Sequence, residues 1–306
     1  MLCDNCRKVE NAAPDLISVV VVAADSGADL LVCVDRVLNA AGGAEIIVSD
    51  NDSRDGSIEA AEERWRDEPR LRIVRNGKNL GFGSGCNRGA AQARGDALLF
   101  LNPDCWIETD TLTRLRACLE ADTGIGLLGA RIVDANGRPE PAGRRRDPLL
   151  RRALATLSGL AHFESRWPAL QGSNLRAAQQ LADVETVEAV SGALMLLPRS
   201  LFERVGGFDE GYFLHCEDLD LCRRVRDAGL RVACANSVAV VHAKGTSGRR
   251  RPFFVAWHKH RGMWRWFSKF DPAARNPLLR FVVWCGLWLH YAVLTPRYAW
   301  ALLRAR

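Results

Sequence analysis

The sequence predicts an α/β protein with a mostly parallel sheet flanked by helices, followed by a helical C-terminal tail. Two observations support this fold class. Short apolar segments alternate with segments whose apolar residues recur at helical spacing, which is typical of βαβ units. The composition, 48% apolar and 25% charged over 306 residues, is that of a globular chain with a sizeable core.

The first half of the chain contains four predicted strands. Residues 16–22 are continuously apolar and β-branched, as expected for a strand buried on both faces. The other strands, and the helices between them, are predicted at 45–49, 71–74 and 97–101, and at 27–40, 57–66 and 86–94. In such sheets ligands bind beyond the carboxyl ends of the strands. Ligand contacts are therefore expected within 23–27, 50–56, 76–87 and 102–106.

The second half of the chain is less regular. Residues 136–182 are rich in Arg, Pro and Gly and are predicted to form a variable loop or lid. Residues 187–197 resemble one strand, 208–228 a turn followed by a helix, and 238–241 a short strand that ends at His242. We expect residues 1–14 to be an N-terminal extension.

The cysteine pattern favours a reduced cytoplasmic protein. The ten cysteines are scattered through apolar stretches, and the first twenty residues do not resemble a signal peptide. Cys3 and Cys6 have the spacing of half a zinc site, but no second pair follows them.

Acidic residues occur at three boundaries of the predicted elements, two after strands and one at the start of a helix. Asp104 ends Asn102-Pro103-Asp104 after an apolar strand, where it can hold a divalent cation or simply belong to a turn. Residues 50–57 contain three carboxylates, of which capping of the next helix explains one. Glu217 and Asp218 begin a helix, where they either complement its dipole or provide a general base.

A glycine-rich segment, Asn79 to Asn87, suggests a dinucleotide-binding loop. However, the Rossmann spacing requires glycine at position 86, which is Cys86. These glycines are better explained by a close backbone approach to a ligand or to another strand. This failed spacing argues against an oxidoreductase.

Taken in order, these segments resemble the family-2 glycosyltransferases of the GT-A fold, and most closely their rhamnosyltransferase-like branch. The resemblance covers residues 16–245 and is carried by strand 16–22, Glu45–Ser57, Arg75-Asn76, Asn79–Gly83, Gly95-Asp96, Phe100–Asp104, Val190–Met195 and Val205–Asp220. It implies a metal-dependent enzyme that moves a sugar from a nucleotide sugar, by our best estimate dTDP-rhamnose, to an acceptor hydroxyl with inversion.

The resemblance also implies residue roles. Asp104, with His242 completing the shell, would bind Mg²⁺ or Mn²⁺, and Asn102 would occupy the weaker first position of the family's Asp-x-Asp motif. Asp218 of the Glu217-Asp218 pair would be the base. The residues expected to contact the nucleotide sugar are Asp25, Asp50, Asn79, Gly81, Asn102, Gly192 and Ala193. One departure is Ala23-Ala24-Asp25, where the family usually has Thr-Tyr-Asn.

The tail, residues 249–306, differs from the catalytic domain expected at 15–248. It holds twelve Lys and Arg, one acid and six of the nine tryptophans, a net charge of +11. Residues 278–294 are nearly all apolar, but a helix of that length spans roughly 25 Å, less than a bilayer core. We therefore expect the tail to lie on an anionic membrane surface, the inner face of the cell membrane. A helix pair packed on the catalytic domain is the alternative.

These observations favour a glycosyltransferase with a glycan or polyprenyl-linked acceptor in cell-envelope polysaccharide synthesis. The alternative is a non-catalytic protein of the same fold that binds nucleotide sugars or glycans. No motif in the sequence indicates nucleic acid as a partner.

Overall fold

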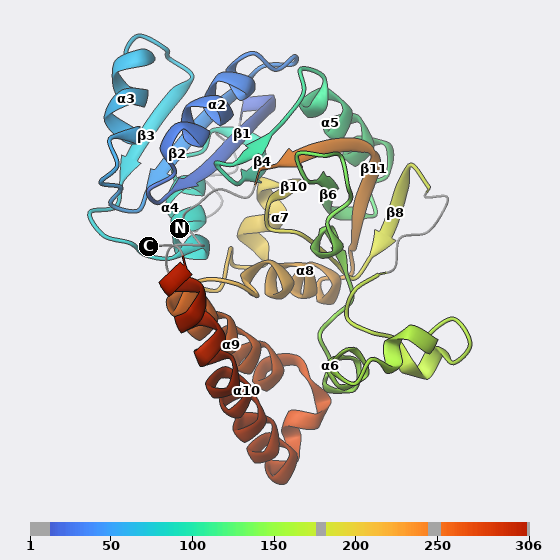
Figure 1. The fold of residues 1–306 in the computed structure, drawn as a ribbon. Coiled ribbons are helices and arrows are strands. Elements are labelled where there is room, and N and C mark those ends of the chain that lie inside the picture. The colour runs from blue at the N-terminus through green and yellow to red at the C-terminus, as the bar shows by residue number, and fades with distance from the viewer. Residues whose placement is uncertain (1–12, 176–181, 244–251, 305–306) are drawn as a thin grey trace, which may run out of the picture.

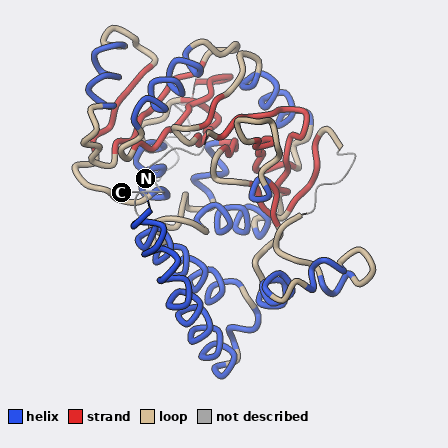
Figure 2. The backbone as a smooth tube through the Cα atoms, in the orientation of Figure 1, coloured by secondary structure: helices blue, strands red, loops and turns tan. Residues whose placement is uncertain are grey.

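A computed structural model describes residues 13–175, 182–243 and 252–304. Within these residues one large mixed sheet forms the centre, with strand order β3-β2-β1-β4-β10-β6-β11-β5 and with β8 paired to β11. Helices cover both faces of the sheet, and two long helices project from one side (Figures 1 and 2). The predicted α/β fold class is confirmed.

The first half of the chain follows the predicted alternation. Its elements are β1 (Ala13–Ala23), α2 (Gly27–Leu38), β2 (Ala44–Asp50), α3 (Ser57–Arg64), β3 (Leu71–Arg75), α4 (Phe82–Ala90) and β4 (Gly95–Leu101). The strands β3, β2, β1 and β4 pair in parallel, so their carboxyl ends share one edge. Val19 and Val20 of β1 are both buried, in the cores on opposite faces of the sheet, as the continuous apolar pattern predicted.

In the second half of the chain, three strands of the sheet run against the direction of the others. Its elements in the sheet are β5 (Cys105–Trp106), β6 (Ile125–Val133), β8 (Val184–Val187), β10 (Leu194–Pro198) and β11 (Arg231–His242), and the helices between them are α5 (Thr111–Ala121), α7 (Arg199–Arg204) and α8 (Glu217–Asp227). β10 is antiparallel to both β4 and β6, whereas β11 is parallel to β6. The carboxyl ends of β6 and β11 therefore lie at the same edge as those of β1 to β4.

Helix α4 begins four residues earlier than predicted, so most of the glycine-rich segment is helical. The reason is close packing on β1. A Cβ on Gly85 would lie 2.8 Å from Val22 Cγ1, and one on Gly89 would lie 2.4 Å from Val20 Cγ1. The glycines thus allow a helix to approach a strand, one of the two explanations that the sequence left open.

The single strand predicted at 187–197 is wrong, because the chain forms three short strands there. β8 pairs with β11, β9 (Ala189–Val190) pairs with β7 (Arg144–Arg145), and β10 pairs with β4. Residues 191–193 form a turn between β9 and β10. This turn changes the strand direction and brings Gly192 and Ala193 to the end of β4.

The segment predicted as a loop contains ordered elements. They are η1 (Pro141–Gly143), β7, α6 (Leu150–Leu157), η2 (Leu160–Phe163) and η3 (Pro168–Leu170), while 176–181 lie outside the described residues. The buried Asp147 holds the segment to α8 through ion pairs with Arg223 and Arg226.

The tail forms a helical hairpin, α9 (Pro252–Phe270) and α10 (Pro277–Arg304), joined through η4 (Pro272–Arg275) (Figure 1). The helices contact each other through Trp257 and Trp288, whose ring centroids are 4.7 Å apart, and through His260 and His290. The apolar helix is longer than predicted, since it continues through Pro296. By length and composition alone its 21-residue window, 277–297, is long enough to cross a bilayer, and none of that window is buried in the protein.

The eight described cysteines are all free thiols. Cys3 and Cys6 lie outside the described residues.

Candidate active site at the carboxyl edge of the sheet

Asp104 and His242 meet at the edge of the sheet. The antiparallel pairing of β5 with β11 places Cys105 opposite His242, and Asp104 precedes that pair. His242 Nε2 lies 3.2 Å from Asp104 Oδ1, and His242 Nδ1 lies 3.3 Å from Glu140 Oε1. Burial lowers the pKa of His242, but its contacts with these two carboxylates outweigh burial and raise the pKa above its ordinary value.

The side chains at this position fit a divalent cation. Two ligand atoms that share a cation at about 2.1 Å from each lie roughly 3 Å apart, which matches the separation of Asp104 Oδ1 and His242 Nε2. Cys105 Sγ is also close enough to be a ligand. Burial and the charge of Asp104 raise the pKa of the Cys105 thiol well above its usual range. Asp104 and His242 supply one carboxylate and one imidazole, a combination that suits Mn²⁺ better than Ca²⁺.

Asp218 lies at the start of α8, behind a strained loop. His215 and Cys216, the two residues before the helix, have φ of 69° and 72°, a left-handed conformation that costs about 1 kcal/mol or more for each non-glycine residue. Asp218 Oδ2 accepts hydrogen bonds from the Arg145 guanidinium and from the Gly192 amide, the latter at 3.0 Å. Burial raises the pKa of Asp218, but the Arg145 guanidinium and the amides of Gly192 and Leu219 together hold it below its ordinary value.

A short chain of contacts joins Asp218 to the metal-ligand residues. Gly192 donates to Asp218, and the next residue, Ala193, accepts a hydrogen bond from the Asn102 amide at 3.0 Å. Asn102 is two residues from Asp104. A Cβ on Gly192 would lie 3.2 Å from Asp218 Cβ, so this approach leaves little room for a larger residue.

Glu217 does not share this environment. Its Cβ lies 3.7 Å from the Cβ that Gly83 of α4 would carry, and the side chain is buried. Burial and the adjacent charge of Asp218 raise the pKa of Glu217 to about 8. The two neighbouring acids therefore differ in charge at neutral pH: Asp218 is ionised, whereas Glu217 is mostly protonated.

The residues predicted to bind the nucleotide form a second connected group. Asp50 Oδ1 accepts a hydrogen bond from the Ser53 amide at 2.9 Å, and Asn51 Nδ2 donates to Gly81 O at 3.0 Å. Asn79 Oδ1 accepts from the Gly81 amide at 2.9 Å. Helix α2 borders the metal-ligand residues, because Cys33 Sγ lies 3.7 Å from Asn102 O. It also borders the loop after β2, because the Gly27 amide donates to Asp55.

Gly81 also connects the nucleotide group to the loop before α8. Its φ is 86°, and an added Cβ would lie 2.3 Å from Phe213 O, the acceptor of the Phe82 amide. A side chain cannot be placed there without moving that loop.

Asp25 stabilises the loop that follows β2. Its Oδ1 accepts from the Arg54 amide at 2.8 Å, and its own amide donates to Ser53 Oγ at 3.2 Å. With a φ of 54°, Asp25 occupies a conformation that Asp and Asn tolerate better than most residues. This explains an acid in the departure from the family pattern, while direct contact of Asp25 with a nucleotide stays a prediction.

Residues 18–205 match the family described as Glycosyl transferase family 2. The chain belongs to this family.

Relatives of this glycosyltransferase include a rhamnosyltransferase. The chain is 31% identical over 261 residues to N-acetylglucosaminyl-diphospho-decaprenol L-rhamnosyltransferase of Mycobacterium tuberculosis, which covers 76% of this chain and 82% of the relative. It is also 25% identical over 245 residues to the low-salt glycan biosynthesis hexosyltransferase Agl10 of Haloferax volcanii, covering 79% of this chain and 71% of that protein. The resemblance to the rhamnosyltransferase-like branch is thereby confirmed.

Solved structures share the fold of this glycosyltransferase. Mannosyltransferase PcManGT from Pyrobaculum calidifontis, in complex with GDP-Man and Mn²⁺, matches with a TM-score of 0.58 and 20% identity, over 98% of this chain and 80% of that one. GalNAc-T7 with UDP, GalNAc and Mn²⁺ matches with a TM-score of 0.64 and 17% identity, over 83% of this chain and 47% of that one. The fold is therefore GT-A, as predicted.

Two residues of the glycosyltransferase site, Arg145 and Glu140, were missed in the sequence. Both come from the irregular segment after β6, where spacing predicts no partner. The only signal was the run Arg144-Arg145-Arg146, three cations in a stretch without helical periodicity. Such a run is more often solvated, but here Arg145 pairs with Asp218 and Arg146 pairs with Glu164.

Glu140 is expected to set the metal affinity of the glycosyltransferase through His242. A carboxylate that accepts from Nδ1 orients the ring so that Nε2 faces the metal. Glu140→Ala should weaken Mn²⁺ binding by roughly 10- to 100-fold, and Glu140→Gln, which keeps an acceptor oxygen, should weaken it less. Titration of Mn²⁺ followed by electron paramagnetic resonance measures both affinities. If Glu140→Ala bound Mn²⁺ with wild-type affinity, Glu140 would have no role in the metal site.

Proposed function

We propose that this protein transfers rhamnose from dTDP-rhamnose to a sugar hydroxyl of a polyprenyl-diphosphate-linked acceptor in cell-envelope polysaccharide synthesis, with inversion at the anomeric carbon. The name of the mycobacterial relative supports both the sugar and the class of acceptor. Among the contacts, the connection from Asp218 through Gly192 and Ala193 to Asn102 supports the proposal most, because it joins a candidate base to a candidate metal site.

The donor would lie along the carboxyl edge of the sheet. Asp50 and Asp25 border the loop after β2 and would hold the base and ribose, with Asn79 and Gly81 beside them. Asp104 and His242 would hold Mn²⁺ or Mg²⁺, which when bound offsets the charge of the leaving diphosphate. The two GT-A structures described above contain Mn²⁺, which agrees with this choice of ion.

Asp218 is the residue that we assign as general base. It is ionised at neutral pH, as a proton acceptor must be, and it contacts the 191–193 turn that we place beside the donor sugar. The acceptor hydroxyl would give its proton to Asp218 while its oxygen attacks the anomeric carbon from the face opposite the diphosphate. This single displacement inverts the configuration and needs no covalent enzyme intermediate. The adjacent acid Glu217 has a raised pKa and packs its Cβ beside α4, so we assign it no proton transfer.

The helical hairpin would bring this site to a lipid-linked acceptor. Large apolar side chains on α10 are exposed, including Leu278, Phe281, Val282, Leu289 and Val293. Together with the cations of 249–306 they suit the inner surface of an anionic membrane. The protein is accordingly proposed to be cytoplasmic and peripheral to that membrane.

Transfer activity tests the function directly. Purified protein with Mn²⁺, a panel of nucleotide sugars and a short-chain N-acetylglucosaminyl-diphosphate lipid should yield product only with dTDP-rhamnose, and NMR of the product should show the inverted anomer. Asp104→Ala and Asp218→Ala should each lower kcat by roughly 10²- to 10⁴-fold. The exposed Asp67→Ala is the control. Full activity of either site variant would refute the mechanism, and donor binding without turnover on any acceptor would favour the non-catalytic alternative.

The pH dependence tests the pairing of Asp218 with Arg145. In Arg145→Met the guanidinium is lost, so burial raises the pKa of Asp218 and the acidic limb of the kcat profile should move to higher pH. Arg146→Met is a matched control, because the adjacent Arg146 pairs with Glu164 at 2.9 Å instead. An acidic limb that is unchanged in Arg145→Met would mean that Asp218 is not the titrating base.

Vesicle binding tests the membrane surface. Phe281→Ser with Val282→Ser should lower partition onto phosphatidylglycerol vesicles by an order of magnitude or more, because two apolar side chains lose their burial. The exposed Val32→Ser on α2 serves as control. Sedimentation with vesicles measures the partition, and equal binding by all three proteins would exclude this face of α10 as the contact.

A further inference from the structure

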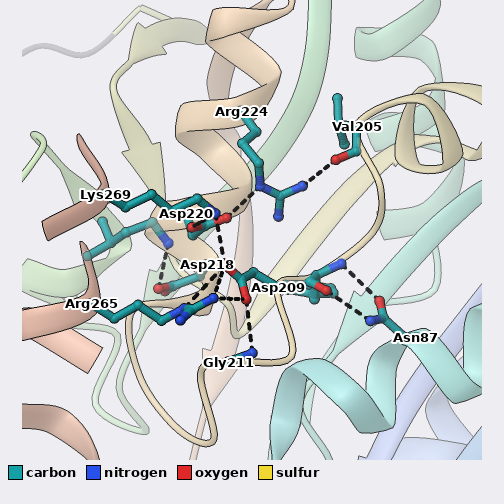
Figure 3. Close-up of polar contacts among 11 residues, drawn as sticks. Asn87, Val205, Asp209, Gly211, Asp218, Asp220, Arg224, Arg265 and Lys269 are labelled. Atoms are coloured by element: carbon teal, nitrogen blue, oxygen red, sulfur yellow. Dashed lines mark hydrogen bonds and ion pairs between the residues drawn. The ribbon is translucent and has the colours of Figure 1, made fainter. Parts of the chain in front are cut away.

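Helix α9 of the tail is joined by ion pairs to the elements around Asp218 (Figure 3). Lys269 Nζ lies 2.7 Å from Asp220 Oδ2 and 2.8 Å from Asp209 Oδ2. Arg265 Nη2 lies 2.8 and 2.9 Å from the two oxygens of Asp209. One acid belongs to α8 and the other to the loop before it, so both cations act across the boundary between the tail and the catalytic domain.

The burial of Asp220 means that loss of these ion pairs would destabilise the protein. Asp220 is 0% exposed and lies two residues after Asp218 in the first turn of α8. Its second oxygen accepts from Arg224, which also donates to Val205 O (Figure 3). Removal of Lys269 would leave Arg224 on one oxygen of this buried carboxylate and deprive the other oxygen of its cation, out of reach of water.

The loop between Asp209 and Asp218 is also in contact with α9. A Cβ on Gly262 would lie 2.6 Å from His215 O, and the ring of Phe213 stacks on His258 at 4.4 Å between centroids. His215 is the first of the two consecutive left-handed residues before Glu217. Such a conformation persists only where the surroundings enforce it, and α9 supplies those surroundings.

We propose that Lys269, Arg265 and Gly262 of the tail are positioning residues for Asp218. The inference rests on the proposed function, in which Asp218 is the base, and extends it by dividing the tail into two parts. α10 faces lipid, whereas α9 holds the strained loop and the first turn of α8 in the geometry that transfer requires. The tail is then necessary for chemistry even when the acceptor is soluble in water and no membrane is present.

Lys269→Met tests the proposal with a short-chain, water-soluble acceptor. Loss of the cation should lower kcat roughly ten- to hundredfold through misplacement of Asp218. The donor KM should change much less than kcat, because Lys269 contacts Asp209 and Asp220 and reaches the nucleotide group only indirectly, through Phe213 and Gly81. Lys269→Arg should recover most of kcat, because it restores a cation. Arg275→Met removes the same charge from an exposed site of the tail and should leave both constants unchanged.

Hydrogen exchange supplies a readout that does not depend on the proposed function. Amides of residues 208–218 should exchange faster in Lys269→Met than in wild type or Arg275→Met. Unchanged exchange, or faster exchange with wild-type kcat, would overturn the positioning role. Gly262→Ala, which presses on His215 O, should give the same two effects if Lys269→Met does not fold. Absence of transfer by the wild-type protein would refute the proposed function, while exchange would still show whether α9 holds this loop.

Discussion

The antiparallel pairing of β10 with β4 is the constraint on which the site depends. Because β10 runs against its neighbour, Leu194 at its start lies beside Leu101 at the end of β4. The turn before β10 therefore meets the residues after β4, and Ala193 accepts the Asn102 amide. A parallel strand at this position would place its first residues at the opposite edge, far from Asp104. One reversed strand thus gives the Asp218 side of the site a fixed contact with the metal side.

Buried charge is the second constraint. Asp218, Asp220 and Glu217 lie in one helical turn, and all three are buried. The helix dipole favours acids in the first turn, but its contribution is too small to offset the burial of three charges. The structure meets this cost separately at each residue. Arg145 compensates Asp218, Lys269 and Arg224 compensate Asp220, and Glu217 takes up a proton. Arg145 comes from the irregular segment and Lys269 from the tail, which makes both segments part of the catalytic domain's electrostatics.

Local pattern predicted the first half of the fold because those strands are parallel and buried on both faces, and each is followed by a helix with its own apolar period. It also singled out Asp50, Asp104, Asp218 and His242 as candidate site residues, since each of them ends or follows a strand or lies at the start of a helix. The sequence pattern failed to predict elements whose position depends on contacts between residues far apart in the chain. The early start of α4 depends on the fit of Gly85 and Gly89 against β1, and the break in 187–197 depends on three different partner strands. Arg145 and Glu140 belong to a segment without periodicity, so only the folded chain identifies their partners.

Asp104 and His242 are proposed to bind the metal within the same site as Asp218. A crystal structure with Mn²⁺ and dTDP, with anomalous scattering recorded at the manganese edge, tests it most directly. We expect one strong anomalous peak within about 2.3 Å of Asp104 and His242, next to the diphosphate. The 191–193 turn and Asp218 should face the open side of that diphosphate. A manganese peak on other residues, or a diphosphate bound away from Asp218, would contradict it.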